Sequence, residues 1–306
     1  MRKFPFNSEY SIMSTFDLDF DKDFYVNNRI DNLDSLKSII AKFRESDLKK
    51  LTKAGVLNKD DAQFELLSLL MEEINSPLFR TSNDKDNLLN NLWLSKASQK
   101  AKLNRATSFY NEFNSSLITN DFLHEIAKLS FDLNNVSKMQ SILMKYGIIL
   151  IYEKYIQGTK IDGACFKLND GTPVITISSR FNRLDSYWFT LLHEIAHIIL
   201  HYEFLNSPII DDLYTNDKSE NKIERQANNL AKSAILNRSY GRSLITEIRN
   251  LRNNTKEASD LISIYSKESH IHPALIAGVL SFELNNYTLF SKLLNSFNVR
   301  EVIFEK

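Results

Sequence analysis

The chain of 306 residues is poor in the residues that cross-link or interrupt a polypeptide. Cysteine occurs once, as Cys165, which excludes an intramolecular disulfide and a four-cysteine metal site. A chain without disulfides is typical of the reducing cytosol. Proline occurs 5 times and glycine 7 times. Because both residues break helices, their scarcity favours long helices.

Neither sign of charge is in excess. Lysine and arginine total 38, aspartate and glutamate also total 38, and the formal net charge is zero. Proteins whose main task is binding nucleic acid usually carry a basic excess, so we expect no direct nucleic-acid binding. Hydrophobic residues make up 43% and charged residues 25%, which excludes wholesale disorder. The length suggests about two domains.

The sequence also lacks a long hydrophobic run. Residues 1–20 mix charges and aromatics and have no apolar core of the kind that an export signal needs. The most apolar run, residues 187–200, contains two histidines and a glutamate. It is shorter than the roughly 20 apolar residues that span a bilayer. We therefore expect a soluble, cytoplasmic protein with no membrane partner.

Helical patterning dominates the first part of the chain, after a poorly patterned aromatic and acidic lead-in at residues 1–30. Apolar residues there recur at three- and four-residue spacing, as on one face of a helix. We expect residues 1–133 to form a mainly helical region that recognises a partner or regulates the protein. The expected helices cover residues 33–43, 64–74, 86–97 and 104–114.

The pattern changes after residue 133. Three strand-type runs, at residues 148–152, 163–168 and 173–178, follow a short helix that Gly147 closes. The last two runs flank a segment with strong hairpin-turn chemistry, residues 169–172. These runs predict a small three-stranded sheet.

A long helix at residues 185–203 follows, with Asp185 as its expected N-cap. Residues 206–219 are polar and are interpreted as a loop before a helix at residues 219–236. We predict an α+β, predominantly helical fold with the sheet packed on the long helix. The expected domains are 1–133, 134–240, which would carry the chemistry, and a helical C-terminal region at 241–306.

The long helix carries His193-Glu194-Ile195-Ala196-His197, the His-Glu-x-x-His pattern. Histidines four residues apart share a helix face, about 5–6 Å apart at Cβ, so both can bind one zinc ion at about 2.1 Å. Glu194 is rotated off the ligand axis, where it can accept a proton from an activated water. Because an ionisable cluster in an apolar run is costly to bury without a purpose, we interpret the motif as a metal site.

A catalytic zinc ion needs a third protein ligand and an open position. His201 lies about 12 Å along the helix axis from His193, so on a straight helix both cannot bind one ion. We expect His201 to support the ligands, contact substrate or simply end the helix. Glu224, at the start of the next helix, is the first choice of third ligand, with Asn228 one turn on to orient it. Glu220 is the alternative, and either glutamate could instead be a solvated carboxylate at a helix start.

The motif and its surroundings resemble a known family. Residues 186–201, followed by Glu224-Arg-Gln-Ala-Asn-Asn-Leu-Ala231, are similar to the ImmA/IrrE zinc metallopeptidases, and residues 161–168 and 173–180 resemble the sheet before that family's zinc helix. The resemblance covers about residues 140–236. It implies a zincin-like fold, His193, His197 and Glu224 as zinc ligands, and Glu194 as the catalytic base. The same ligands also bind manganese and iron.

A weaker resemblance, at residues 43–55 and 92–113, links the chain to HigA-like regulators, in which a helix-turn-helix precedes an ImmA/IrrE-type domain. Residues 1–42 are too short and badly patterned for that DNA-reading part. The chain also lacks the proline that usually follows the third ligand, since residues 234–237 read Ala-Ile-Leu-Asn. This departure concerns the substrate cleft and not the metal ligands.

The resemblance implies a zinc-dependent endopeptidase whose protein substrate is a helix-turn-helix repressor or an antitoxin. Such peptidases act in stress, phage, mobile-element or toxin–antitoxin circuits. The competing hypothesis is a non-proteolytic regulatory protein that uses the same fold to bind a transcription factor or toxin. The intact Glu194 argues against it, because a binding module does not need the base.

Some residues have two interpretations. Cys165 is expected to be a buried small apolar residue, with a redox or zinc-masking role as the alternative. His270, just before His272-Pro273, is expected in a surface turn but could supply the cleft with an imidazole. Arg180 and Arg183 are expected to form ion pairs, although they could bind a substrate.

Two further interpretations concern the substrate. The strand at residues 173–178 could pair with an extended substrate if it lies at the sheet edge, or it could be an interior strand. Tyr202 and Tyr214 are candidate hydroxyl donors to the transition state, whereas Tyr187 and Trp188 are expected to pack in the core.

Overall fold

The computed structural model describes residues 45–74, 85–180, 182–206, 208–211, 222–251 and 254–304. Four expectations lie outside these residues. They are the lead-in at residues 1–30, the helix at residues 33–43, the alternative ligand Glu220 and the hydroxyl donor Tyr214.

Three helices form the first described part of the chain, α2 (Glu45–Lys53), α3 (Ala62–Ile74) and α4 (Lys85–Thr107). The sequence pattern predicted two helices at residues 86–97 and 104–114. The structure instead has the single helix α4, because no glycine or proline interrupts residues 98–103. Residues 108–114 are not helical, so that part of the prediction is wrong.

The next elements are η2 (Ser115–Leu117), α5 (Asn120–Lys128), η3 (Leu129–Phe131) and α6 (Asn135–Met144). The N-cap of α5 is Thr119, whose side chain accepts a hydrogen bond from Phe122 N. Gly147 follows α6 at φ 72°, as the sequence predicted for the residue that closes this helix. A Cβ at Gly147 would lie 2.6 Å from Phe113 N and 2.7 Å from Asn111 O, so only glycine fits the bend into the first strand.

The sheet contains β1 (Ile149–Glu153), β2 (Gly163–Lys167), β3 (Pro173–Ser178) and β4 (Ile209–Asp211), in the order β1-β3-β2-β4. β1 pairs in parallel with β3, and β2 pairs antiparallel with β3 and with β4. The predicted hairpin between β2 and β3 is present. β4 lies in the segment interpreted as a loop, and it extends the three predicted strands by a short fourth one.

β3 lies inside the sheet, between β1 and β2. The hypothesis that the strand at residues 173–178 pairs with a substrate is therefore wrong, because both of its edges are already hydrogen-bonded to neighbours. The alternative interpretation, an interior strand, is correct.

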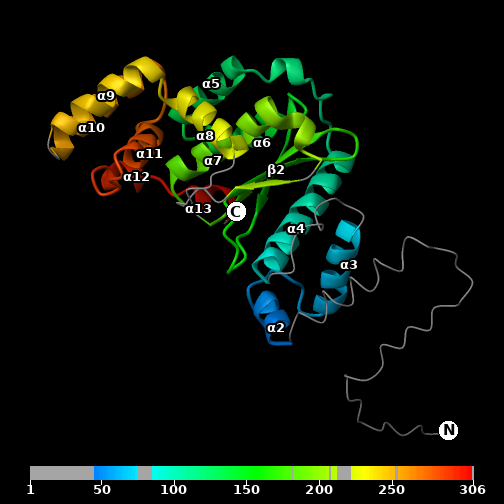
Figure 1. Ribbon diagram of the computed structural model, residues 1–306. Coiled ribbons are helices and arrows are strands. Elements are labelled where there is room, and N and C mark those ends of the chain that lie inside the picture. The colour runs from blue at the N-terminus through cyan, green and yellow to red at the C-terminus, as the bar shows by residue number, and fades with distance from the viewer. Residues whose placement is uncertain are drawn as a thin grey trace, which may run out of the picture.

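Helices cover both faces of the sheet (Figure 1). Alternate strand residues point to opposite faces, so β1, β2 and β3 each supply both layers. On one face, strand residues pack in the main core with α7 (Leu184–His201). The other face packs against Ala97 and Ala101 of α4. The residues toward α7 are Leu150, Cys165, Ile175 and Ile177, and those toward α4 are Ile149, Ile151, Phe166 and Val174.

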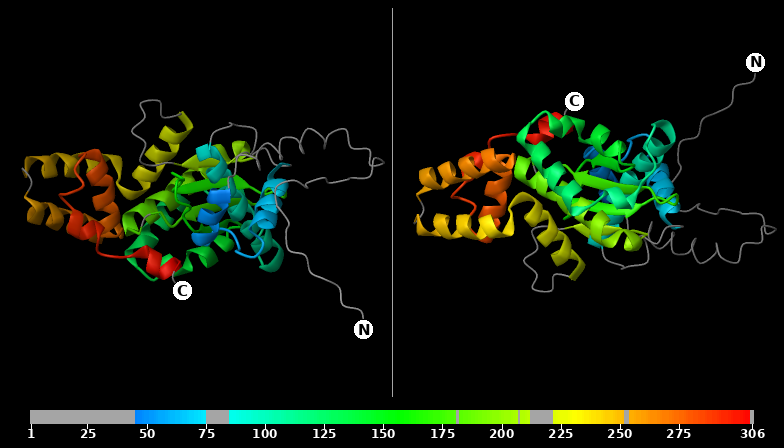
Figure 2. Two further views of the ribbon diagram at one scale, coloured as in Figure 1. Left: turned by 90° about the horizontal axis from the view of Figure 1, so that it is seen from below. Right: turned by 90° about the horizontal axis from the view of Figure 1, so that it is seen from above.

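The remaining helices are η4 (Tyr202–Phe204), α8 (Lys222–Ile235), α9 (Arg238–Asn250), α10 (Thr255–Ser269), α11 (Pro273–Glu283), α12 (Ser291–Leu294) and α13 (Val299–Ile303). α8 and α11 both pack on α7. α9 and α10 lie together at the end of the molecule opposite α2 and α3 (Figure 2). The helical C-terminal region is interrupted before His272-Pro273, and Pro273 lies in the first turn of α11.

α13 returns to the segment that leads into α7. Val299 N donates a hydrogen bond to Asn182 O at 2.8 Å, and Arg300 Nη2 donates one to Ser179 O at 2.7 Å. The connection between β3 and α7 is thus held by a distant part of the chain.

The predicted fold class, α+β and predominantly helical, is confirmed. Among the described helices, none combines the length and apolarity needed to cross a membrane.

Candidate metal centre

α7 carries the His-Glu-x-x-His motif through the middle of the molecule. The side chains of His193, Glu194 and His197 are fully buried. The predicted N-cap role of Asp185 is wrong, because the N-cap is Arg183 and Asp185 lies in the first turn. There Asp185 pairs with Arg183 Nη2 at 2.7 Å, and its negative charge suits the amino end of a helix.

The two histidines meet a glutamate from the next helix. His193 Nε2 lies 2.9 Å from His197 Nε2. Glu224 Oε2, on α8, lies 3.2 Å from His193 Nε2 and 3.6 Å from His197 Nε2. The ligand atoms of the three residues all lie within 4.8 Å of one another. The structure therefore brings together the three predicted ligands from two helices.

These separations match the geometry of a single tetrahedral ion. Ligands at about 2.05 Å from zinc are about 3.3 Å apart at tetrahedral angles. The observed distances of 2.9, 3.2 and 3.6 Å bracket that value. Two imidazole nitrogens and a carboxylate oxygen are also a donor set that zinc accepts in catalytic sites. The residues present thus fit a zinc ion.

The protonation states of the site also suit a metal. Burial lowers the pKa of His197, although the nearby Glu224 carboxylate opposes the shift. Burial alone would raise the pKa of Glu224, but hydrogen bonds with His193 and His197 outweigh it and hold that pKa at about 2. A neutral imidazole and an ionised carboxylate are the forms that bind cations.

Glu194 lies on α7 against the start of β2. A Cβ built at Gly163 would collide with Glu194 Oε1 and would lie 2.6 Å from Thr190 Cγ2. The negative charge of Glu194 also reaches Cys165, two residues along β2. The pKa of that thiol is raised, by burial first and by Glu194 second. The space that Gly163 leaves is therefore occupied by the candidate base, a relation that the sequence analysis missed.

His201 continues the histidine stripe on the outer side of His197. Its Nδ1 lies 3.1 Å from His197 Nδ1, and its Nε2 lies 3.3 Å from Oε1 of Gln226, on α8. His201 is 5% exposed. No sequence pattern pointed to Gln226 as part of the site. Asn228, the predicted orienting residue, is half-buried one turn beyond Glu224, and its role stays a prediction.

The structure also shows the surroundings of the other residues for which the sequence left two interpretations. Cys165 is fully buried in the core, as expected of a small apolar residue. Tyr202 donates its hydroxyl hydrogen to Gly171 O of the hairpin turn, at 2.6 Å. Arg180 pairs with Asp162 at 3.2 Å, an ion pair as expected. His270 ends α10 at φ 57°, with its ring 5.8 Å from that of Phe131.

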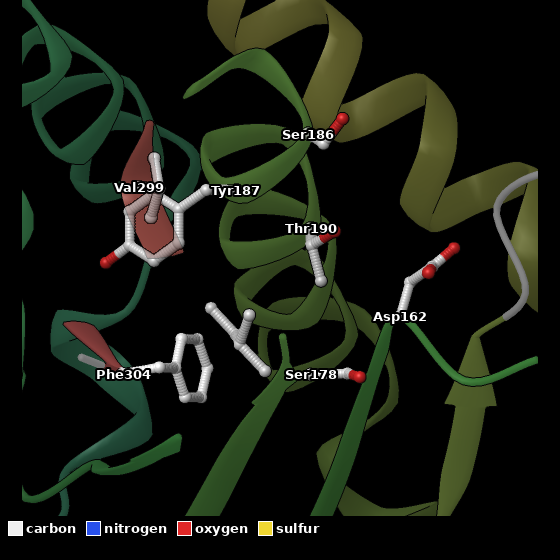
Figure 3. Close-up of a pocket in the computed structure, with 8 residues that line it drawn as sticks. Asp162, Ser178, Ser186, Tyr187, Thr190, Val299 and Phe304 are labelled. Atoms are coloured by element: carbon white, nitrogen blue, oxygen red, sulfur yellow. The ribbon is translucent and has the colours of Figure 1, made fainter. Parts of the chain in front are cut away.

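A pocket adjoins the face of α7 that carries Glu194. Figure 3 shows Asp162, Ser178 and Thr190 on one side of it, with Tyr187 and Phe304 on the other. Thr190 is one turn before Glu194, and Asp162 directly precedes Gly163. Tyr187 shares a hydrogen bond of 2.9 Å with Tyr152, and like Trp188 it is buried, as expected.

Comparison with known proteins identifies the region that contains this centre. Residues 144–255 match the family Peptidase_M78, described as the IrrE N-terminal-like domain. The matched range includes all four strands of the sheet, together with α7 and α8. Comparisons with curated proteins and with solved structures find no match.

Proposed function

We propose that this protein is a zinc-dependent endopeptidase, because residues 144–255 match the Peptidase_M78 family of IrrE N-terminal-like domains. The observation that carries the proposal is the convergence of His193, His197 and Glu224, whose ligand atoms lie within 4.8 Å of one another. Glu194, next to the first histidine, supplies a carboxylate that is not among these ligands. A pure metal-binding site would not need it.

His193, His197 and Glu224 would hold the metal. When bound, a zinc ion supplies Lewis acidity, which makes water a better nucleophile and polarises the carbonyl of the scissile peptide bond. Glu194 accepts the proton that the attacking water loses. As the carbon–nitrogen bond breaks, Glu194 transfers this proton to the leaving amine nitrogen.

The burial of the centre indicates how a substrate reaches it. His193, Glu194 and His197 are fully buried, whereas the side chain of Glu224 retains 22% of its exposure. Part of the Glu224 side chain therefore reaches solvent, although its ligand atom Oε2 is buried. A peptide bond would approach the centre past Glu224, and the burial of Glu194 would keep bulk water away from its carboxylate.

The substrate that we propose is a protein, a helix-turn-helix repressor or an antitoxin. The support is the resemblance of residues 140–236 to the ImmA/IrrE peptidases, together with the zero net charge of the chain. A balanced chain is better suited to act on a DNA-binding protein than on DNA itself. Cleavage of such a regulator would relieve repression or release a toxin.

The test uses the purified full chain with zinc and, as a candidate substrate, any helix-turn-helix regulator found to be encoded beside its gene. The Glu194→Gln variant removes the proton acceptor with little change of shape. Glu203→Gln is the matched control, because Glu203 is exposed just beyond α7. We expect the wild type and Glu203→Gln to cleave the regulator equally, and Glu194→Gln to be slower by at least about 100-fold.

Equal cleavage by all three proteins would contradict the role of Glu194. Binding of the regulator by the zinc-loaded wild type without any cleavage would instead favour the competing function, a non-proteolytic regulator that binds a transcription factor or toxin. Metal content is measured on the same samples, so that loss of zinc is not mistaken for loss of the base.

A further inference from the structure

We propose that His201 is a positioning residue, which fixes the tautomer and the ring orientation of His197 through a chain of hydrogen bonds that ends on Gln226. The proposal rests on the metal site of the proposed function but not on its peptidase activity. Two distances define this chain of hydrogen bonds, 3.1 Å between the Nδ1 atoms of His197 and His201 and 3.3 Å from His201 Nε2 to Gln226 Oε1.

The location of the contact excludes His201 as a fourth ligand. His197 points its Nε2 toward His193 and Glu224, while its Nδ1 points toward His201. His201 therefore contacts the side of the His197 ring that faces away from the ligand atoms. Within the described residues, the group of side chains able to hold one ion consists of His193, His197 and Glu224.

The direction of each hydrogen bond follows from counting protons. A neutral imidazole carries one N–H. If His197 binds a cation through Nε2, its proton must be on Nδ1, which then donates to His201 Nδ1. That nitrogen must accept, so the proton of His201 is on Nε2 and is donated to Gln226 Oε1. An amide oxygen only accepts, and this fixes the end of the chain.

The hydrogen bond between His197 and His201 lies in the interior of the protein. His197 is fully buried and His201 is 5% exposed, so water competes little for the hydrogen bond between them. Gln226 is exposed on α8, and its hydrogen bond is correspondingly weaker. A ligand histidine that has lost such a partner commonly binds its metal about 10–100-fold less tightly. We therefore expect most of the effect at His201 and a smaller one at Gln226.

A pair of nearly isosteric variants tests this chain of hydrogen bonds. In His201→Asn, the side-chain oxygen takes about the position of His201 Nδ1 and can still accept a hydrogen bond from His197. His201→Leu has nearly the same size and no acceptor. Zinc affinity is measured on the full chain by competition with a chromophoric chelator. We expect a loss of about 10–100-fold for His201→Leu, recovery of most of it in His201→Asn, and a smaller loss for Gln226→Leu.

The outcomes separate a polar role from a structural one. Equal zinc affinity in the two His201 variants, whether weakened or unchanged, would overturn the proposal. Thermal unfolding of the metal-free variants shows whether each is folded. Should His201→Leu not fold, the zinc affinities of His201→Asn and Gln226→Leu are each compared with that of the wild type. A loss of zinc affinity that is larger in Gln226→Leu than in His201→Asn is expected only if the asparagine oxygen replaces His201 Nδ1 as the acceptor.

A second readout reports the tautomers directly. Imidazole ¹⁵N spectra of the zinc-loaded wild type should show the proton of His197 on Nδ1 and that of His201 on Nε2. A proton on His201 Nδ1 would overturn the proposal. Neither measurement requires turnover. If the protein binds zinc through these histidines but cleaves nothing, the result would therefore contradict the proposed function and leave the role of His201 intact.

Discussion

Gly163 lies where β2 begins, in contact with the carboxyl group of Glu194. A methyl group there would collide with Glu194 Oε1 and Thr190 Cγ2. Thr190 is fixed on a buried helix, so the carboxylate must move. We expect Gly163→Ala to lower the rate of substrate cleavage by about 10-fold or more, because proton transfer depends on hydrogen-bond reach. Zinc affinity should stay near that of the wild type, since the atoms nearest to the added methyl group belong to Glu194 and Thr190, neither of which is a proposed ligand.

The control for this prediction is a double-mutant cycle. If Gly163→Ala acts through Glu194, the change should cost little further activity in a Glu194→Gln background. Additive losses in the double variant would show that Gly163 affects the centre by another route, and the displacement of the carboxylate would then be the wrong explanation.

Residue spacing predicted the parts of the centre that lie on one helix and failed for contacts between distant elements. His193 and His197 follow from the four-residue repeat of a helix face. Glu224 was the first of two open choices, and the structure places it against both histidines. Gly163 and Gln226 were missed, because a glycine at a strand start and a glutamine on a helix carry no signal of what packs against them.

The bend between α6 and β1 shows how a helix end can depend on one residue. Gly147 and Gly55 have nearly the same backbone, φ 72° and 70°. Only Gly147 has backbone atoms close to the position of a Cβ, whereas Gly55 has nothing within 4 Å. Gly55→Ala therefore measures the cost of the left-handed conformation alone, about 1–2 kcal/mol. We expect Gly147→Ala to lower the free energy of unfolding by clearly more, as chemical denaturation can measure.

Equal losses of stability in the two variants would contradict the close packing around Gly147. The comparison is matched, since both positions follow a helix and both change from glycine to alanine.

At the level of elements, patterns with several supporting residues were predicted correctly. The hairpin of β2 and β3 had turn residues between two apolar runs, and the helix of the motif had a continuous apolar face. β4 has only three residues, Ile209–Asp211, too few for any periodicity to be visible. The interior position of β3 depends on its parallel pairing with β1, which is a contact over a long sequence distance that local patterns do not encode.

Zinc binding should stabilise the whole folded molecule, because the proposed ligands come from two helices that meet only in the folded state. A ligand that binds only the folded state stabilises it by about 2.7 kcal/mol at 100 times its Kd. For a domain of this size, we expect free zinc at that level to raise Tm by roughly 5–10 °C. Removal of the metal with a chelator should reverse the rise. The Glu224→Ala variant, measured in the same scans, should show a much smaller shift, and an equal shift would place the metal elsewhere.

The single cysteine determines how this centre should behave under oxidation. The proposed ligands are imidazole and carboxylate groups, whereas zinc sites built on thiolates are lost when their sulfur is oxidised. Cys165 is fully buried and its raised pKa disfavours the reactive thiolate. We expect hydrogen peroxide at concentrations that strip zinc from cysteine sites to leave the zinc stoichiometry of the folded protein unchanged, as metal analysis after desalting would show. Such a centre would keep working while the thiol chemistry of the surrounding cell fails.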